Sequence, residues 1–195
     1  MNKILILLIF FPLNLHSQNL DVEIMKKVNK IPELNKTLRF ISNSEPYIMI
    51  TIPVSIMGIG LAKHDNDVIK GGAVIALSAV VNLGITTIIK HSVKRRRPFR
   101  EYPGIIFNNT GKTLNDYSFP SGHTSGSFTA AASLSLLYPK WYVIIPAYLW
   151  AATVGYSRVQ LGAHYPSDVL AGATLGTGTA YLTFVINKKL KNEIK

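Results

Sequence analysis

Residues 71–89 read GGAVIALSAVVNLGITTII, a run of nineteen residues that contains no Asp, Glu, Lys or Arg. A helix gains about 1.5 Å per residue, so this run is close to the length that crosses the ~30 Å hydrocarbon core of a bilayer. Residues 90–98 follow directly, read KHSVKRRRP and carry five Lys and Arg side chains. The two stretches together predict a transmembrane helix that ends in a positively charged loop.

Four further apolar runs have similar length, and none of the five runs holds a charged residue in its interior. The predicted spans are residues 47–62, 71–89, 122–138, 141–156 and 169–186. Gly172, Gly176 and Ala180 recur at four-residue intervals, a spacing of small residues that lets helices pack closely in lipid. The sequence therefore predicts an all-α integral membrane bundle over residues 47–187, with a soluble all-helical core as the alternative.

The composition agrees with a lipid environment. Hydrophobic residues make up 48% of the chain and charged residues only 16%, against about a quarter in soluble domains. The net charge is +11, and ten of the 21 basic residues lie in two clusters, within residues 90–100 and 188–195. Because the first cluster stands between apolar runs, we expect it to meet phosphate groups or anionic headgroups rather than nucleic acid. The absence of cysteine excludes disulfides and thiolate metal sites.

The N-terminus resembles an export signal. Lys3 precedes an apolar run, and Ser17 is a suitable small residue before a cleavage point, which predicts a signal peptide over residues 1–17 or an uncleaved anchor. Residues 18–46 mix polar and apolar side chains at helical spacing, which predicts an amphipathic segment on the membrane surface. Residues 188–195 are predicted to form a basic cytoplasmic tail.

Counting spans from an exported residue 18 places the loops 90–121 and 157–168 on the outer face. The basic tail then lies inside, as the positive-inside rule expects, but the full count does not fit, with eight Lys and Arg inside and 13 outside. We base the orientation on the export signal. The predicted location is a bacterial-type inner (plasma) membrane, with the functional site facing the periplasm or the exterior.

Three polar clusters terminate spans on this outer face: residues 90–98, PSGH at 120–123 and SRVQLGAHYPSD at 157–168. Arg offers planar paired donors to phosphate oxygens, Lys offers a point charge, and the start of a helix offers free N–H groups. Of the two histidines, one can attack phosphorus while the other protonates the leaving oxygen. Asp168 follows His164 by four residues, close enough to accept its ring N–H. No carboxylate or thiolate cluster suggests a metal.

These residues resemble the signature of the type-2 phosphatidic acid phosphatase superfamily. The signature reads Lys, six residues, Arg-Pro; then Pro-Ser-Gly-His; then Ser-Arg, five residues, His, three residues, Asp. All eleven specified positions occur here, in order and at the expected spacing. The superfamily includes membrane lipid phosphatases, bacterial acid phosphatases and vanadium haloperoxidases.

The resemblance implies a role for each matching residue. His164 would attack the phosphate in line and become a phosphohistidine, Asp168 would orient it, and His123 would protonate the leaving group. The implied phosphate-binding residues are Lys90, Arg97, Ser121, Gly122 and Arg158. No cofactor or metal is implied, and the expected substrate is a lipid phosphate or pyrophosphate in the membrane. Membrane members usually have six spans, whereas five spans plus the N-terminal segment are predicted here.

Three other functions stay open from the sequence. A phosphatase of soluble phosphomonoesters would need the five runs to be core helices, and a vanadate-dependent haloperoxidase would use the same pocket with His164 bound to vanadium. A membrane scaffold without activity is disfavoured, because unused buried cations are costly to keep. Four basic residues outside the signature are predicted to contact a second phosphate or an anionic headgroup, or only to attract an anionic membrane surface. They are Lys94, Arg95, Arg96 and Arg100.

Overall fold

The computed structural model describes residues 16–29 and 35–193. This part of the chain consists of α-helices joined by loops. The helices are α1 (His16–Val28), α2 (Asn35–Ala62), α3 (Asn66–Val93), α4 (Pro98–Glu101), α5 (Gly122–Leu137), α6 (Trp141–Gln160) and α7 (Pro166–Glu193). The described residues contain no strand, and their one β-bridge pairs Arg96 with Tyr117. The all-α prediction is confirmed.

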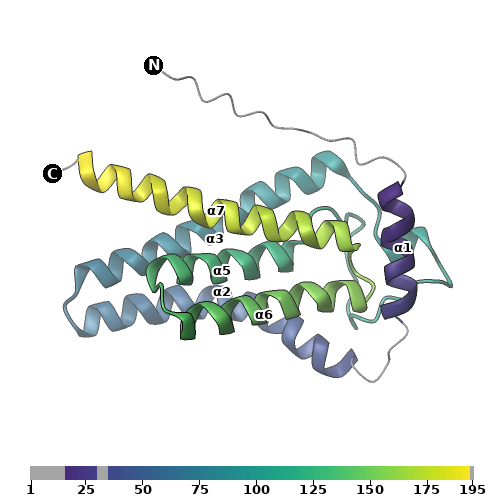
Figure 1. The fold of residues 1–195 in the computed structure, drawn as a ribbon, viewed down its shortest axis with the longest axis horizontal. Helices are drawn as coiled ribbons and strands as arrows, with labels where there is room; N and C mark the ends of the chain where they lie inside the picture. Colours follow the sequence, from purple (N-terminus) through teal and green to yellow (C-terminus); the bar gives the residue numbers. More distant parts are fainter. Residues whose placement is uncertain (1–15, 30–34, 194–195) are drawn as a thin grey trace, which may run out of the picture.

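Five long helices lie side by side, and the short helix α1 lies across one end of them (Figure 1). Helix α5 occupies the centre, since it packs against α2, α3, α6 and α7. The loops 94–121 and 161–165 both lie at the end covered by α1. We call this the site end of the bundle, and the opposite end, with the loops 63–65 and 138–140, the far end.

Three of the five long helices are long and apolar enough to cross a membrane: Lys36–Ala62, Asn66–Val93 and Pro166–Leu190. Helix α5 has 16 residues and α6 has 20, and neither is among these three candidates. The membrane-protein character is therefore supported by three spans, and the five-span topology stays a prediction.

Helix α2 begins at Asn35, so the boundary predicted at residue 47 lies inside a continuous helix. Its first turns are polar, and Ser42 is fully buried against the site end, where its hydroxyl accepts a hydrogen bond from Arg158. Hydropathy alone therefore does not distinguish a polar residue that contacts a buried side chain from a polar residue on the surface. The earlier part of the predicted surface segment, residues 18–29, lies in α1 and just after it. Residues 30–34 are outside the described residues.

Two other sequence predictions concern the chain ends. The export signal over residues 1–17 falls almost wholly outside the described residues, and its cleavage stays a prediction. The predicted basic tail continues α7 as far as Glu193, and its last two residues lie outside the described part.

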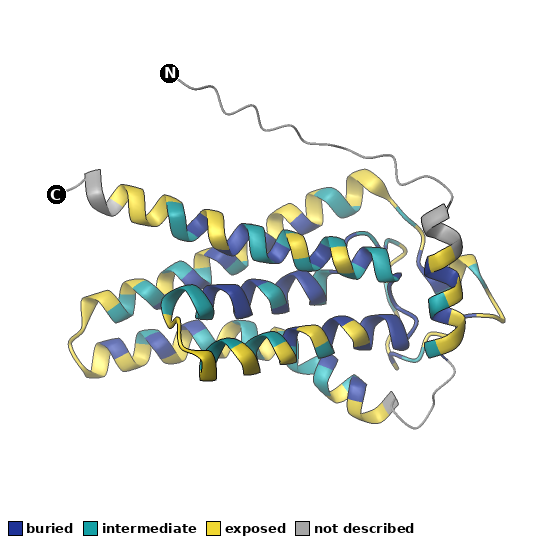
Figure 2. Cartoon of the chain, viewed as in Figure 1, coloured by how far each residue is buried: buried dark blue, intermediate teal, exposed yellow. Residues whose placement is uncertain are grey.

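Exposed residues recur along α2, α3, α6 and α7 (Figure 2), and many of them are large and apolar. Val54, Leu61, Val80, Leu83, Ile88 and Leu182 are each more than half exposed. Soluble monomers rarely expose apolar surface on this scale, whereas helices in a bilayer meet lipid tails with such side chains. This surface disfavours the alternative of a soluble all-helical core.

Helices α5 and α7 approach each other closely along a line of small residues. A Cβ atom on Gly172 would lie 2.7 Å from the carbonyl oxygen of Ser121, and one on Gly176 would lie 2.1 Å from that of Ser125. Ala180 continues the line and is buried. The close packing predicted from this four-residue spacing is confirmed, and it holds the start of α7 against the start of α5.

Candidate active site

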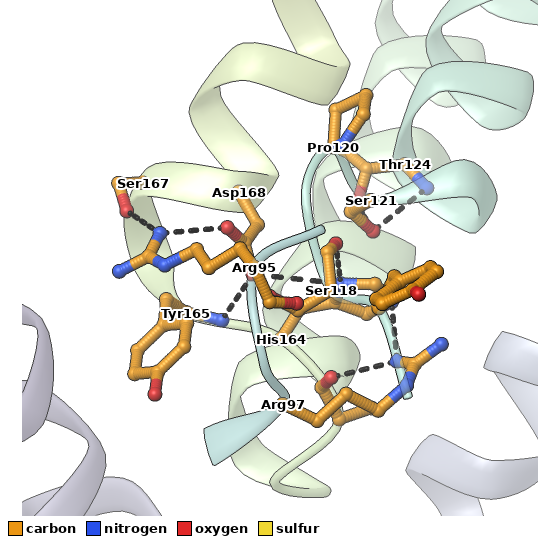
Figure 3. A network of polar contacts seen from close by, with 12 residues as sticks. Arg95, Arg97, Ser118, Pro120, Ser121, Thr124, His164, Tyr165, Ser167 and Asp168 are labelled. Atoms are coloured by element: carbon orange, nitrogen blue, oxygen red, sulfur yellow. Dashed lines mark hydrogen bonds and ion pairs between the residues drawn. The ribbon is translucent and has the colours of Figure 1, made fainter. Parts of the chain in front are cut away.

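The three polar clusters meet at the site end of the bundle (Figure 3). Lys90 Nζ donates to the carbonyl of Pro120 at 2.9 Å, which joins the first cluster to the second. Arg97 Nη1 donates to the carbonyl of Ala163 at 2.8 Å, and the amide of Ser121 donates to the carbonyl of Asp168 at 3.1 Å. Each pair of clusters is therefore connected by at least one hydrogen bond.

His164 lies in the loop between α6 and α7, and it is only 2% exposed. Its Nδ1 lies 2.7 Å from the carbonyl oxygen of Ser118, and its Nε2 lies 3.1 Å from Arg97 Nη1. A carbonyl can only accept and a guanidinium can only donate, so Nδ1 must carry the proton and Nε2 the lone pair. Burial, together with the positive charges of Arg97, Arg158 and Lys90, holds the pKa of His164 well below its ordinary value.

Gly162 makes the turn that presents this imidazole. Its φ of +76° lies in the left-handed region, and a Cβ atom there would lie 2.1 Å from the carbonyl oxygen of Phe107. The turn allows the amides of Ala163 and His164 to donate to the carbonyl of Arg158, at 3.0 and 3.1 Å. Arg158 and His164 are thereby connected through the backbone.

Arg97 is held by the loop that follows it. Its Nε donates to the carbonyl of Asn115 and its Nη2 to the side-chain oxygen of the same residue, both at 2.6 Å. Burial lowers the pKa of Arg97 to about 10, with the attraction of Asp168 opposing it, so the side chain stays charged at neutral pH.

Arg158 is only 3% exposed and donates from Nη1 to the hydroxyl of Ser42 at 2.7 Å. Its Nε is buried and has no hydrogen-bond partner among the described residues. A buried guanidinium with an unused donor is suited to an anionic ligand.

Helix α5 starts at the centre of the site. Ser121 is its N-cap, and the hydroxyl is fully buried and paired with Thr124 Oγ1 at 2.8 Å. The same hydroxyl oxygen accepts the Thr124 amide and so caps the helix, and the N–H groups of Gly122 and His123, which have no partner inside the helix, point toward the site end. His123 follows, and its electrostatic neighbours are Arg158, His164, Lys112 and Arg97.

The sequence of the chain matches the model of a known protein family. The model of the PAP2 superfamily matches residues 71–192, more than half of the chain. The chain belongs to the PAP2 superfamily. An undecaprenyl-diphosphatase of Sulfolobus acidocaldarius is 31% identical over 98% of this chain and 93% of its own length. A lipid A 4′-phosphatase of Bacteroides thetaiotaomicron is 34% identical over 60% of this chain and 57% of its own length.

Solved structures of PAP2 proteins share the fold. The transmembrane PAP2-type phosphatidylglycerolphosphate phosphatase of Bacillus subtilis superposes with a TM-score of 0.73 and 25% identity. The match covers 89% of this chain and 87% of that chain. LpxE of Aquifex aeolicus gives a TM-score of 0.70 at 22% identity, over 85% of this chain and 94% of that chain. This PAP2 protein therefore has the helical architecture of membrane-embedded relatives.

One expected contact of this PAP2 site is not formed. The ring N–H of His164 donates to the Ser118 carbonyl, and Asp168 Oδ2 lies 3.7 Å from Nδ1, too far for a hydrogen bond. Asp168 is instead fully buried, with Oδ1 accepting from Arg95 at 2.7 Å and Oδ2 from the Tyr165 amide at 3.0 Å. Its negative charge still lies beside the imidazole.

The basic residues outside the PAP2 signature divide into two groups. Arg95, for which the sequence predicted contact with a phosphate or headgroup or attraction to an anionic membrane surface, is bound to the carboxylates of Asp168 and Asp21. Arg96 pairs loosely with Glu101 at 3.8 Å, and Arg100 pairs with Asp116 at 3.0 Å. Lys94, Arg96 and Arg100 are exposed on the rim, where contact with a headgroup stays a prediction.

Sequence reasoning about this PAP2 site missed the residues that support the signature side chains. Ser118 orients His164, Asn115 holds Arg97, and Ser42 contacts Arg158. Polar residues of these types are common in loops and helix starts, so the sequence offers no signal that distinguishes them.

Among the described residues, His, Asp and Glu side chains form no group of three or more that would hold a metal ion.

Proposed function

We propose that this PAP2 protein hydrolyses a lipid-like phosphomonoester or pyrophosphate through a phosphohistidine on His164, without a metal. One observation carries the proposal: Nε2 of a buried, neutral imidazole faces Arg97 while Nδ1 is fixed on the Ser118 carbonyl. An imidazole in this tautomer has its lone pair available for attack on phosphorus. The lipid A and undecaprenyl substrates in the relatives' names support a lipid phosphate as the substrate class.

Phosphate binding is assigned to the cations around Nε2. Arg97 and Arg158 would each donate to phosphate oxygens, and Lys90 would add a point charge. The N–H groups at the start of α5, beginning with Gly122, would add the positive end of a helix dipole. Ser121 contributes by capping that helix, so its contact with phosphate would run through the backbone. When phosphate binds, Arg97 would turn its Nη1–H from Nε2 to a phosphate oxygen and so release the lone pair.

The reaction would proceed in two steps. The lone pair on His164 Nε2 forms a bond to phosphorus while the bond from phosphorus to the leaving oxygen breaks, and His123 gives that oxygen a proton. A water then attacks the phosphohistidine, His123 takes its proton, and the N–P bond breaks to release phosphate. The dianionic substrate offsets the surrounding cations and so makes the protonated form of His123 accessible. Asp168 would stabilise the positive imidazole ring of the intermediate.

The lipid and the membrane side are further parts of the proposal. The relative that matches nearly the full chain is named for undecaprenyl diphosphate, which favours a polyprenyl pyrophosphate over the other candidates. The export-signal pattern favours an inner (plasma) membrane with the site facing the periplasm or exterior. Three apolar helices with outward-facing side chains support the membrane location.

The deciding experiment is phosphate release by the purified chain in detergent with EDTA present. The panel contains polyprenyl pyrophosphate, phosphatidic acid, phosphatidylglycerol phosphate, lipid A and a soluble phosphomonoester. We expect release from at least one lipid and its loss in His164→Ala. Absence of release from every lipid, or equal release by His164→Ala, contradicts the proposal.

Two further measurements test the finer parts. Rapid quenching of wild-type turnover should trap an acid-labile phosphate on His164, which mass spectrometry locates. Its absence at times when product has already formed would contradict covalent catalysis. An alkaline-phosphatase fusion at the C-terminus should be inactive and a fluorescent-protein fusion should fluoresce. The reverse pattern would invert the proposed orientation.

A further inference from the structure

Arg95 bridges two carboxylates that lie far apart in the sequence. Its Nη1 donates to Asp168 Oδ1 at 2.7 Å, and its Nη2 donates to Asp21 Oδ2 at 2.9 Å. Its guanidinium carbon lies 3.8 Å from the centre of the Tyr165 ring, against which the side chain stacks (Figure 3). Burial opposes its charge, but the carboxylates of Asp168 and Asp21 outweigh burial and raise the pKa of Arg95. Arg95 is therefore a permanent cation with two carboxylate partners, and its Nη1 also donates to the Ser167 hydroxyl at 2.7 Å.

Asp21 belongs to α1, which precedes the region that the PAP2 family model matches. It is 4% exposed, and its two oxygens accept the amide and the hydroxyl of Ser167, the residue before Asp168. The same carboxylate thus holds both Arg95 and the first turn of α7.

The rest of α1 is anchored around the site. Val22 and Met25 form a buried cluster with Ile106, Val159 and Tyr165. Asn29, just after α1, donates to the carbonyls of Phe107 at 3.1 Å and Gln160 at 2.9 Å, and accepts from the Phe107 amide at 2.8 Å. These contacts connect α1 to the loop after α4, to the end of α6 and to the start of α7. The position of Asp21 is therefore set by packing and by several hydrogen bonds.

Asp168 connects this bridge to the imidazole. One of its oxygens is bound to Arg95, and the other is bound to the Tyr165 amide and lies 3.7 Å from His164 Nδ1. Removal of Arg95 would leave a fully buried carboxylate without its strongest partner, and such a group changes its rotamer or takes up a proton. Either response would change the charge that His164 experiences when its ring becomes positive.

We propose that Asp21 and Arg95 are positioning residues through which α1 holds Asp168 ionised and aligned beside His164. This inference rests on the proposed function, since its effect is on the phosphohistidine step. Helix α1 is then a part of the active site, although it lies outside the matched family region and contributes no signature residue.

The test compares kcat and KM of matched variants on the lipid that the wild type hydrolyses. Asp21→Asn should lower kcat about tenfold and leave KM within about twofold, because supporting residues affect the chemical step more than binding. The control is Glu23→Gln, which removes an exposed carboxylate from the same helix and should leave kcat unchanged.

Arg95→Gln should lower kcat about 100-fold, and Arg95→Lys should recover part of the loss, since one ammonium group keeps the charge but cannot bridge both carboxylates. Arg96→Gln, at an exposed neighbour, is the control. In the double variant Asp21→Asn/Arg95→Gln, the fold-loss of kcat should be smaller than the product of the two single losses, because both single changes remove the same Asp21–Arg95 contact. Additive losses, or an Asp21→Asn that behaves like Glu23→Gln, overturn the inference.

The temperature dependence of kcat in Asp21→Asn separates a structural role of Asp21 from a positioning role. If the loss of kcat in Asp21→Asn disappears well below its unfolding temperature, the residue only stabilises the fold and the inference fails. A readout independent of turnover is the ¹⁵N NMR signal of the His164 Nδ1–H, which should shift in Asp21→Asn and Arg95→Gln but not in Glu23→Gln. This signal tests the positioning role even if no lipid in the panel is hydrolysed. The absence of hydrolysis by itself would contradict only the proposed function.

Discussion

Both ends of the bundle carry basic side chains, but among the described residues the site end buries two of its arginines. At the far end, five lysines whose exposure the structure describes are all exposed: Lys63, Lys70, Lys140, Lys188 and Lys189. At the site end, Arg97 is 5% and Arg158 is 3% exposed. A cation at a helix end costs little in water, whereas a buried cation is costly unless its surroundings and a ligand compensate it. The difference teaches that burial, not basic composition, distinguishes the ligand-binding end.

The largest expected difference between the two ends concerns histidine. His164→Ala should lower turnover by about 10⁴-fold or more, because the variant loses the proposed nucleophile. His64→Asn is the matched change at the far end, where the exposed residue has a φ of +52° that Asn tolerates. Its phosphate release should equal that of the wild type. Comparable losses in both variants would remove the functional distinction between the ends.

The second difference concerns the cations themselves. Arg97→Lys should lower kcat/KM about 100-fold, because three nitrogens of Arg97 make fixed contacts that one ammonium group cannot reproduce. Lys188→Arg at the far end keeps an exposed charge and should change kcat/KM less than about twofold. Steady-state kinetics in detergent measures both. Full activity of Arg97→Lys would mean that the charge at this position suffices without its geometry.

The third difference concerns the packing of α7 against α5, which extends from the site end toward the far end. Gly176→Ala should destabilise the fold by about 2 kcal/mol, because the new Cβ would lie 2.1 Å from the Ser125 carbonyl oxygen. Gly178→Ala, two residues further along the same helix, meets nothing within 4 Å and should be neutral or slightly stabilising. Thermal unfolding in detergent compares the two. Equal stability would show that α5 and α7 can separate without cost.

The smallest expected difference concerns pH. The folded protein keeps His164 neutral, since its pKa lies well below the ordinary value, whereas the unfolded chain takes up a proton below about pH 6.5. The stability that this residue contributes is therefore fully present above pH 6.5 and falls as the pH decreases, by at most about 2 kcal/mol at pH 5. The drop in unfolding temperature from pH 7.5 to pH 5 should be smaller in His164→Gln and unchanged in His64→Asn. An unchanged drop in His164→Gln would mean that this imidazole is protonated in the fold.

Local patterns were enough to predict much of the fold. Charge-free runs of 16 to 19 residues gave the five long helices, because a helix in lipid must carry apolar side chains on its exposed faces. The helix that contains the first run begins earlier, at Asn35, and the polar Ser42 in its added part accepts a hydrogen bond from Arg158. Whether α5 and α6 also cross the membrane is a question of bilayer position, which hydropathy leaves open.

The motif residues were predictable because their chemistry is specific in combination. Two imidazoles, three cations and a helix start within one chain favour phosphate transfer, and their spacing matched a known signature. Their mutual contacts were not predictable. The bond from His164 to the Ser118 carbonyl spans 46 positions, and the expected bond to Asp168 is replaced by it.

Sequence alone was sufficient for the class of protein and for the choice of the side chains that we propose to bind phosphate, because hydropathy and residue chemistry are properties of short segments. The tertiary structure alone decided which groups support them. Asp21 and Ser167 lie 146 positions apart and touch only because α1 folds over the start of α7. Contacts between distant segments depend on how helices pack, and packing is a property of the whole chain that no single segment carries.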